Sequence, residues 1–175
     1  MPNSQSDAKP PAGGAPIRPG EQSVPLPAAF DAGLVFIGEI RTPFATLADC
    51  PKNPREGQVE ATVSLDPRYL AGLDGIERFS HLILLYWMDA ARRDLIRQTP
   101  RHLDAPRGVF ALRSPLRPNP VSLAVVELLS VSGATLTIKG IDCRDRTPLI
   151  DIKPYFATTD SIPDARAVSH GGRQA

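Results

Sequence analysis

The sequence predicts a mainly β protein: a small antiparallel β-barrel with a few short helices and a proline-rich N-terminal tail. Three observations support this fold class. The apolar segments are short and follow one another closely, several of them alternate apolar and polar residues, and no long helical crossover lies between them. The sequence also lacks the glycine-rich strand-turn-helix loop that is typical of doubly wound sheets. We therefore expect a barrel or closed sheet.

The 175 residues suffice for one domain with a real core and are too few for two ordinary domains. We expect a flexible tail over residues 1–32, a barrel domain over residues 33–156 and a C-terminal extension over residues 157–175. The first 30 residues contain seven prolines and three glycines. Such a segment buries too little apolar surface to offset its conformational entropy.

Apolar segments are predicted to form the strands of the barrel. Residues 58–65 alternate apolar and polar side chains, as in a strand with one buried face, whereas residues 79–88 are almost continuously apolar and fit a strand through the centre of a barrel. Ser132 and Gly133 favour a hairpin between two of the segments. The predicted strands cover residues 34–40, 58–65, 79–88, 121–131, 134–141 and 149–155.

Two short helices are expected between these strands. Asp66 followed by Pro67 is a typical helix start, with a capping side chain and then proline at the first helical position, so we expect one or two turns over residues 69–73. Residues 89–98 are a second candidate helix, with its arginines facing water, that ends at Pro100.

Positive charge is concentrated in one part of the chain. The formal net charge is only +1, which implies neither wholesale disorder nor a protein that coats nucleic acid. Between residues 92 and 117, however, seven arginines stand against two aspartates, a local net charge of about +5. This segment is either a solvated face or an electropositive binding surface.

A stiff basic loop follows residues 108–112, which are predicted to form a short strand. Arg113 and Arg117 lie four residues apart in this loop, and two guanidiniums on a rigid loop favour binding of an anion or a carboxylate. The alternative is that both arginines hold loops together by pairing with aspartates. Three prolines restrain the backbone between and after them: Pro115, Pro118 and Pro120.

The remaining signals exclude several classes. Cys50 and Cys143 fit no metal-binding motif, so we expect reduced thiols and no metal. No stretch of about 18 apolar residues is present, so no membrane span is expected. The N-terminus lacks a basic-then-apolar signal layout, which makes the cytoplasm the default expectation.

Five blocks of residues occur in an order that is typical of one family. Because of these blocks the chain, over about residues 34–156, resembles the TsaA-like family, also called the TrmO or YaeB family. One block alone would be unremarkable, whereas five in the right order are specific. The blocks are residues 37–44 (IGEIRTPF), 50–53 (CPKN), 75–82 (GIERFSHL), 113–120 (RSPLRPNP) and 151–155 (DIKPY).

The resemblance implies a β-barrel methyltransferase that uses S-adenosylmethionine and acts as a homodimer. It also implies a substrate, N6 of threonylcarbamoyladenosine at position 37 of tRNA, beside the anticodon. Arg113 is the expected donor to the cofactor's carboxylate, and Asp142 or Asp89 the expected partner of its ribose or amino group. Matching the blocks implies cofactor contacts at Pro51, Lys52, Asn53, Met88, Asp89, Arg113, Ser122, Leu123, Asp142, Cys143, Arg144 and Asp145.

Two further groups of residues receive roles under this resemblance. Asp151 and Tyr155 are candidates, by residue type, for the general base that removes the N6 proton. The arginine-rich segment is the expected contact for phosphates of the tRNA anticodon stem-loop. Its members are Arg92, Arg93, Arg97, Arg101 and Arg107.

The chain departs from the bacterial pattern of this family at four positions. It has Lys52 and Asn53 where that pattern has arginine and glutamine, Asp89 in place of histidine, and Arg146 in place of a glycine. Two alternatives therefore stay open. The first is an S-adenosylmethionine-dependent methyltransferase of a small molecule or another RNA. The second is a non-catalytic module that binds S-adenosylmethionine or RNA.

Overall fold

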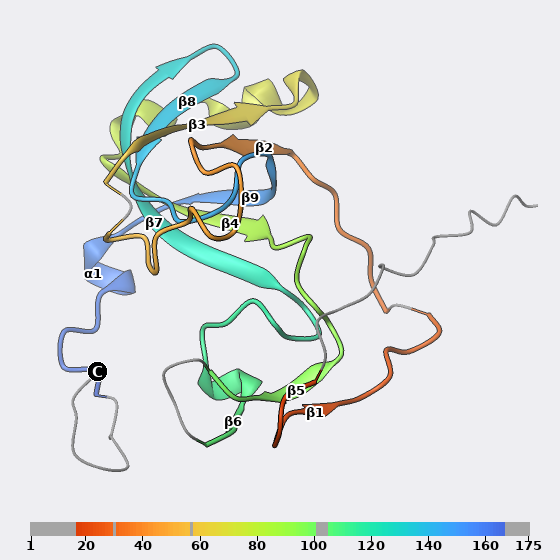
Figure 1. Cartoon of the computed structure of the whole chain (residues 1–175). Helices are drawn as coiled ribbons and strands as arrows, with labels where there is room; N and C mark the ends of the chain where they lie inside the picture. The colour runs from red at the N-terminus through yellow and green to blue at the C-terminus, as the bar shows by residue number, and fades with distance from the viewer. Residues whose placement is uncertain (1–16, 30, 57, 101–104, 167–175) are drawn as a thin grey trace, which may run out of the picture. The chain divides into compact units, whose positions relative to one another are not determined.

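The computed structural model describes residues 17–29, 31–56, 58–100 and 105–166 (Figure 1). The chain forms two compact units, Leu34–Trp87 with Leu123–Ala175 and Met1–Gly33 with Met88–Ser122, which we describe separately. The strands are β1 (Gln22–Ser23), β2 (Gly38–Arg41), β3 (Glu60–Leu65), β4 (His81–Trp87), β5 (Leu95–Gln98), β6 (Arg107–Gly108), β7 (Val121–Ser132), β8 (Thr135–Lys139) and β9 (Thr147–Pro154). The helical segments are the 3₁₀ turns η1 (Pro67–Leu73), η2 (Ile76–Arg78) and η3 (Val109–Ala111), and the single turn α1 (Ala157–Asp160).

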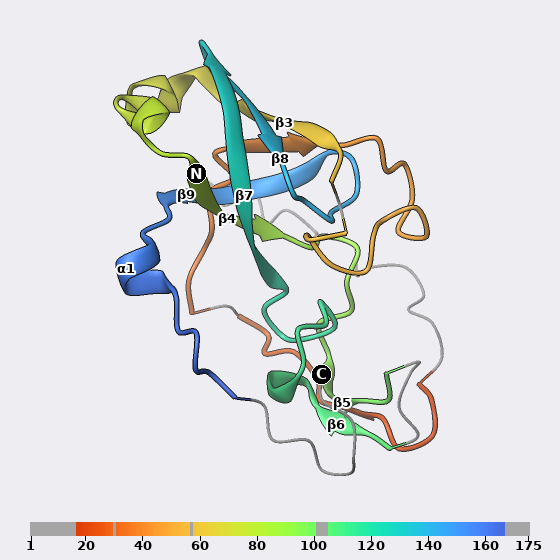
Figure 2. The same ribbon diagram turned by 90° about the vertical axis from the view of Figure 1, so that its left-hand side faces the viewer.

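Six antiparallel strands close into a barrel in the order β2-β3-β8-β7-β4-β9, which confirms the predicted fold class (Figures 1 and 2). The short strand β2 lies between β3 and β9, so that Ile40 is opposite Val63 on one side and Thr147 on the other. The predicted hairpin is also confirmed, because β7 and β8 pair up to Ser132 opposite Thr135.

The interior of the barrel is filled by aliphatic side chains, and along β3 and β4 buried positions alternate with more exposed ones. On β3 the side chains of Ala61, Val63 and Leu65 are buried, whereas Thr62 and Ser64 are partly exposed, as the alternation predicts. Burial of each large aliphatic side chain contributes about 1.5–3 kcal/mol, so this core stabilises the barrel and fixes its loops. The largest fully buried residues of this unit include Ile40, Leu82, Leu84, Leu136, Ile138, Ile141 and Leu149.

The helical turn predicted after β3 is present as η1. The Asp66 side chain accepts a hydrogen bond from the backbone N–H of Arg68 at 3.0 Å, and Pro67 occupies the first helical position. The Arg68 guanidinium also donates to this carboxylate, which lowers the pKa of Asp66 to about 2. Local sequence alone therefore specifies this turn.

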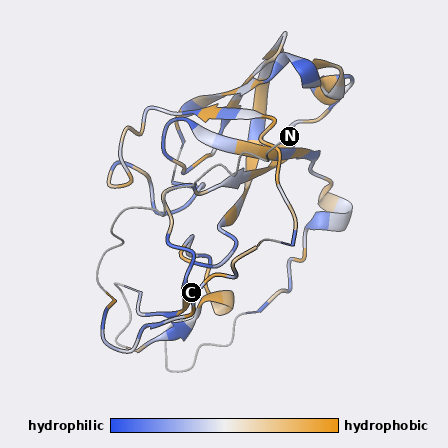
Figure 3. Ribbon diagram, turned by 90° about the vertical axis from the view of Figure 1, so that its right-hand side faces the viewer, coloured by the Kyte–Doolittle hydropathy of each residue, from blue (hydrophilic) through white to orange (hydrophobic). Residues whose placement is uncertain are grey.

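The other unit contains the three-stranded sheet β1-β5-β6, in which β1 and β6 pair with opposite edges of β5. Two sequence predictions are wrong here. Residues 89–98, a candidate helix, end in strand β5, because Leu95 is only 1% exposed and both strand edges are paired, which overrides local helix propensity. Residues 108–112, a predicted strand, mostly form the apolar turn η3 (Figure 3).

The division into tail, barrel domain and extension stays a prediction. Residues in the predicted tail take part in sheet pairing, since Gln22 lies opposite Arg97. Within the described ranges, no helix is long and apolar enough to cross a membrane.

Candidate functional site

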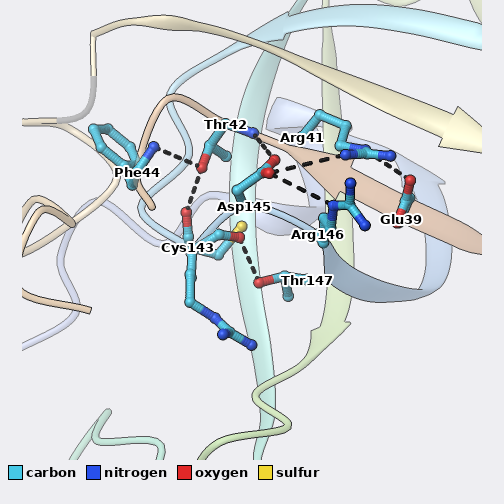
Figure 4. A network of polar contacts seen from close by, with 9 residues as sticks. Glu39, Arg41, Thr42, Phe44, Cys143, Asp145, Arg146 and Thr147 are labelled. Carbon is cyan, nitrogen blue, oxygen red and sulfur yellow. Dashed lines mark hydrogen bonds and ion pairs between the residues drawn. The ribbon is translucent and has the colours of Figure 1, made fainter. Parts of the chain in front are cut away.

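Residues 142–145, which precede β9, are tied to residues 42–44, which follow β2 (Figure 4). The Thr42 hydroxyl donates to the Cys143 carbonyl at 3.0 Å, and the Thr42 N–H donates to Asp145 Oδ1 at 3.1 Å. The Asp145 N–H returns a bond to the Phe44 carbonyl at 2.8 Å. Sequence reasoning assigned no role to Thr42, although its position in the first motif block was a usable signal.

The second carboxylate oxygen of Asp145 faces two arginines of the same unit (Figure 4). Oδ2 lies 3.9 Å from Nη1 of Arg41 and 4.0 Å from Nε of Arg146, while Nε of Arg41 pairs more closely with Glu39 at 2.7 Å. These side chains are at least a third exposed, so each ion pair is weak in water. Both oxygens of Asp145 are thus engaged by the protein itself.

A strained turn leads from this segment into β9. Arg146 has φ 63°, and it is the one non-glycine residue with positive φ among the described residues. A side chain in this left-handed conformation costs about 1–2 kcal/mol. The turn is closed by Thr147, whose hydroxyl donates to the Arg144 carbonyl at 2.7 Å. Glycine, which the bacterial pattern of the resembling family has here, would adopt this conformation without that cost.

Asp142 is held by a buried tyrosine. The hydroxyl of Tyr86, which is only 3% exposed, donates to Asp142 Oδ1 at 2.8 Å. The next residue, Cys143, points into the core, where burial raises the pKa of its thiol to about 12. The side chain of Cys143 is therefore inert packing, and any ligand contact from this residue has to come from its main chain.

The predicted loop of residues 50–53 lies beside the same segment. A Cβ atom added at Gly140 would be 3.8 Å from the Pro54 carbonyl oxygen, and the pKa of Cys50 is raised by burial and by the nearby Asp142 carboxylate. Asn53 uses its amide within the loop, donating to Glu56 at 2.7 Å. The barrel unit thus brings together two of the predicted cofactor segments, residues 50–53 and 142–145.

Both cysteines are free thiols, as expected. Within the described part of the chain, no three His, Cys, Asp or Glu side chains are arranged to hold a metal ion.

Met88, Asp89, Arg113 and Ser122 belong to the other unit, where Met88 meets the proline-rich loop. The Met88 N–H donates to the Pro120 carbonyl at 2.9 Å. Arg117 supports this loop, because its guanidinium donates to the carbonyls of Ser114 (2.9 Å), Val109 (3.0 Å) and Leu112.

Arg117 therefore supports its loop through main-chain carbonyls, where the sequence suggested aspartates as the partners. The Val109 carbonyl also accepts from the Leu112 N–H at the end of η3, at 3.2 Å, so Arg117 supports this turn as well. The neighbouring arginine of the loop, Arg113, is exposed.

The arginine-rich segment divides into engaged and exposed side chains. Arg92 forms a two-bond pair with Asp94, at 2.9 and 2.6 Å, and Arg93 donates to the Pro118 carbonyl at 2.7 Å. Arg97 and Arg107, on the paired strands β5 and β6, are exposed. Arg101 lies outside the described residues. Two of the described arginines therefore support the fold of their own unit, and two face solvent.

The candidate bases lie along β9 and just beyond it. Asp151 pairs with Lys153 at 2.6 Å. The Tyr155 N–H donates to the carbonyl of His81, five positions before Tyr86 on β4, which corresponds to about 17 Å along a strand. Because Tyr86 holds Asp142, the structure does not bring Tyr155 to residues 142–145 of the same chain.

Comparisons with known proteins agree with the barrel and its motifs. Residues 39–161 match the family model of the tRNA-methyltransferase O N-terminal domain. A protein of Methanothermobacter thermautotrophicus named "probable S-adenosyl-L-methionine-binding protein" is 44% identical over 126 residues, covering 72% of this chain and 91% of that protein. The Escherichia coli "tRNA (adenine(37)-N6)-methyltransferase" is 34% identical over 142 residues, covering 75% of this chain and 60% of the enzyme.

Solved structures give the same assignment. The crystal structure of TrmO from Pseudomonas aeruginosa superposes with a TM-score of 0.65 at 34% sequence identity, covering 78% of this chain and 61% of that one. The chain thus spans about three fifths of the length of this protein and of the Escherichia coli enzyme. It belongs to the family of the tRNA-methyltransferase O N-terminal domain.

Proposed function

We propose that the chain is an S-adenosylmethionine-dependent methyltransferase that acts on N6 of threonylcarbamoyladenosine at position 37 of tRNA. The observation that carries this proposal is the 34% identity with the Escherichia coli tRNA (adenine(37)-N6)-methyltransferase, which extends over three quarters of the chain. The family assignment supports the methyltransferase class, and the five motif blocks support the threonylcarbamoyl substrate.

Asp142 of the barrel unit and Arg113 of the other unit each have a side chain that suits the proposed cofactor. Asp142 is half-buried and oriented by the Tyr86 hydroxyl, so its carboxylate is suited to accept hydrogen bonds from ribose hydroxyls or an ammonium group. Arg113, exposed on a loop with three prolines, is suited to pair with the cofactor's carboxylate. When bound, S-adenosylmethionine supplies an electrophilic methyl group, and the protein's task is to align it with the acceptor nitrogen.

Of the two proposed bases, Asp151 is the better one, and its carboxylate pairs with Lys153. The Lys153 ammonium lies 2.6 Å from Oδ2 of Asp151 and helps to fix the position of this carboxylate. Asp151→Asn is expected to remove methyl transfer and leave cofactor binding within about twofold, because a base acts only in the chemical step.

We propose that Arg97 and Arg107 contact phosphates of the anticodon stem-loop. Both are exposed on paired strands, where Arg97 lies opposite Gly108 and Arg107 lies opposite Gln98. Because successive side chains of a strand alternate faces, the two arginines leave opposite faces of this sheet, and each offers its own charge to a phosphate. Replacing both with glutamate is expected to weaken tRNA binding and to flatten its salt dependence, measured by fluorescence anisotropy between 50 and 200 mM salt, the range in which phosphate contacts dominate. Arg78→Glu, an exposed arginine on η2, is the matched control, and equal losses in both variants would contradict the assignment.

We propose that the protein is a homodimer that uses the outer face of β7. Leu123, Val125 and Leu129 are exposed by 43%, 39% and 40% on this strand, and water-exposed apolar side chains in one row favour association. Val125→Asp is expected to yield a monomer in light scattering, with Glu127→Asp on the same face as the control. A monomeric wild type would exclude the dimer.

Two measurements test the proposed activity. Titration calorimetry with S-adenosylmethionine tests the cofactor, and mass spectrometry of position-37 nucleosides in tRNA from a deletion strain tests the substrate. Loss of the N6-methylated nucleoside in that strain, with its restoration by the cloned chain, is expected. Because tRNA is modified in the cytoplasm, we propose that location, and we propose the barrel domain of residues 33–156 as the unit that binds the cofactor.

A second function, S-adenosylmethionine binding without tRNA methylation, is favoured by one observation. The Methanothermobacter relative is named only as a binding protein, yet it is 44% identical to this chain, more than the Escherichia coli enzyme is, and nearly its whole length is matched. Cofactor binding together with unchanged tRNA nucleosides would favour this alternative or a methyltransferase with another acceptor. Absence of cofactor binding would exclude both the tRNA methyltransferase and a methyltransferase with another acceptor.

A further inference from the structure

We infer that Thr42 is a positioning residue that fixes the conformation of residues 142–145, and that Asp145 serves this linkage instead of touching the cofactor. The inference rests on the proposed function, in which this segment holds S-adenosylmethionine. It concerns two side chains that lie between the segment and the loop after β2, and it assigns each of them a task that the motif blocks do not specify.

Thr42 connects the two loops through both its hydroxyl and its main chain (Figure 4). Its Oγ1 donates to the Cys143 carbonyl at 3.0 Å and accepts from the Phe44 N–H at 3.2 Å, so one hydroxyl bridges both loops. Its N–H donates to Asp145 Oδ1 at 3.1 Å. Thr42 precedes Pro43, which restricts it to an extended backbone and holds these donors in place.

The segment is held on each side of the position where Thr42 binds. The Asp145 N–H donates to the Phe44 carbonyl at 2.8 Å, and the Arg144 carbonyl accepts from the Thr147 hydroxyl at 2.7 Å. Because backbone groups from Cys143 to Asp145 are bonded to fixed elements, the segment is preorganised in one conformation. A preorganised segment binds a ligand more tightly, since less ordering is needed on binding.

The carboxylate of Asp145 is used by this linkage and by its arginine neighbours. Oδ1 accepts from Thr42, and Oδ2 lies near Arg41 and Arg146 at 3.9 and 4.0 Å. Asp142, in contrast, is oriented by the side chain of Tyr86 from the core. Of the two aspartates predicted as cofactor contacts in this segment, we therefore assign the ligand contact to Asp142 and the positioning role to Asp145.

Substitutions at Thr42 separate this role from a general effect on folding. Thr42→Val keeps the shape and removes the bridging hydroxyl, whereas Thr42→Ser keeps the hydroxyl. Thr42→Val is expected to weaken S-adenosylmethionine binding about five- to tenfold in calorimetry, and Thr42→Ser to stay within about twofold of the wild type, because two hydrogen bonds are lost in the first and none in the second. Thr137→Val, a half-buried threonine on β8, is the matched control and is expected to bind normally.

Hydrogen exchange supplies a readout that a general loss of stability would not produce. In Thr42→Val the amides of residues 143–145 are expected to exchange faster, while those of β3 and β4 exchange as in the wild type. Uniformly faster exchange through the barrel, or no change at residues 143–145, would overturn the inference.

Asp145 variants test its assignment. Asp145→Asn keeps an oxygen for the Thr42 N–H and is expected to bind the cofactor within about threefold of the wild type, whereas Asp145→Ala is expected to bind about tenfold more weakly. Equal, severe losses in both would mean that the charge of Asp145 contacts the cofactor. If the wild type binds and Thr42→Val binds equally well, the inference fails and the proposed function stands. If the wild type itself does not bind, the proposed function fails and the inference fails with it.

Discussion

Tyr86 donates its hydroxyl to Asp142 Oδ1 at 2.8 Å and so links the C-terminal end of β4 to the segment before β9. Tyr86→Phe is expected to lower the free energy of unfolding by about 1.5–3 kcal/mol, because the lost hydrogen bond is made to a charged group from a buried side chain. Urea denaturation measures this change. Tyr69→Phe on η1, half-buried, is the control and should change stability by less than about 0.5 kcal/mol; a similar cost for both variants would contradict the role of the Tyr86 hydroxyl.

Gly38 allows β2 to approach β3 closely. A Cβ atom at this position would lie 2.3 Å from the Ser64 carbonyl oxygen, which is backbone and cannot move aside cheaply. Gly38→Ala is therefore expected to destabilise the barrel by about 1–3 kcal/mol in urea denaturation. At Gly72 an added Cβ meets nothing within 4 Å, so Gly72→Ala should be close to neutral. Wild-type stability of Gly38→Ala would show that β2 shifts without cost.

Asp66 makes the barrel sensitive to acid in a defined pH window. Hydrogen bonds from Arg68 lower the pKa of Asp66 from 3.8 to about 2 in the folded protein. Because the folded pKa is the lower one, the stabilisation is present above about pH 4 and is lost as the pH falls from about 4 to about 2. In Asp66→Asn, which keeps a capping oxygen, the urea midpoint should fall less steeply over this window. Parallel pH profiles for the two proteins would contradict this prediction.

Arg146 adopts a backbone conformation that favours glycine, with φ 63°. Arg146→Gly relieves about 1–2 kcal/mol of left-handed strain and loses about 0.5–1 kcal/mol through the greater freedom of the unfolded chain. We therefore expect equal or slightly higher stability in urea denaturation. Arg97→Gly on β5, where the backbone is an ordinary paired strand, is the control and should be destabilised by about 1 kcal/mol. Destabilisation of Arg146→Gly to the same extent would mean that the Arg146 side chain stabilises the turn.

Local signals predicted those parts of the fold that depend on local physics. The alternation of residues 58–65 predicted β3, the Asp66-Pro67 pair predicted η1, and the glycine after Ser132 predicted the β7–β8 hairpin. The cap and the turn depend on interactions within a few residues. The strand depends on which of its two faces is apolar and therefore buried. Short, successive strands without a helical crossover then leave a barrel as the natural closed solution.

Predictions failed where long-range contacts decide. Residues 89–98 contain a strand because β1 and β6, distant in sequence, pair with both of its edges. Around η3, the carbonyls of Val109 and Leu112 accept hydrogen bonds from the Arg117 guanidinium, which lies outside the segment 108–112. Neither partner is visible in a local pattern, so propensity alone suggested the wrong elements.

The candidate site shows the same division. The sequence by itself determined the residue types, since the motif blocks contain Thr42 and the arginines of the proline-rich loop and indicate the family to which the chain belongs. Only the tertiary structure decided the tasks of Thr42, Asp142 and Asp145. Asp142 is oriented from the core by Tyr86, whereas Asp145 joins two loops through Thr42. Both tasks depend on hydrogen bonds between residues more than fifty positions apart, and chain folding alone brings those residues together.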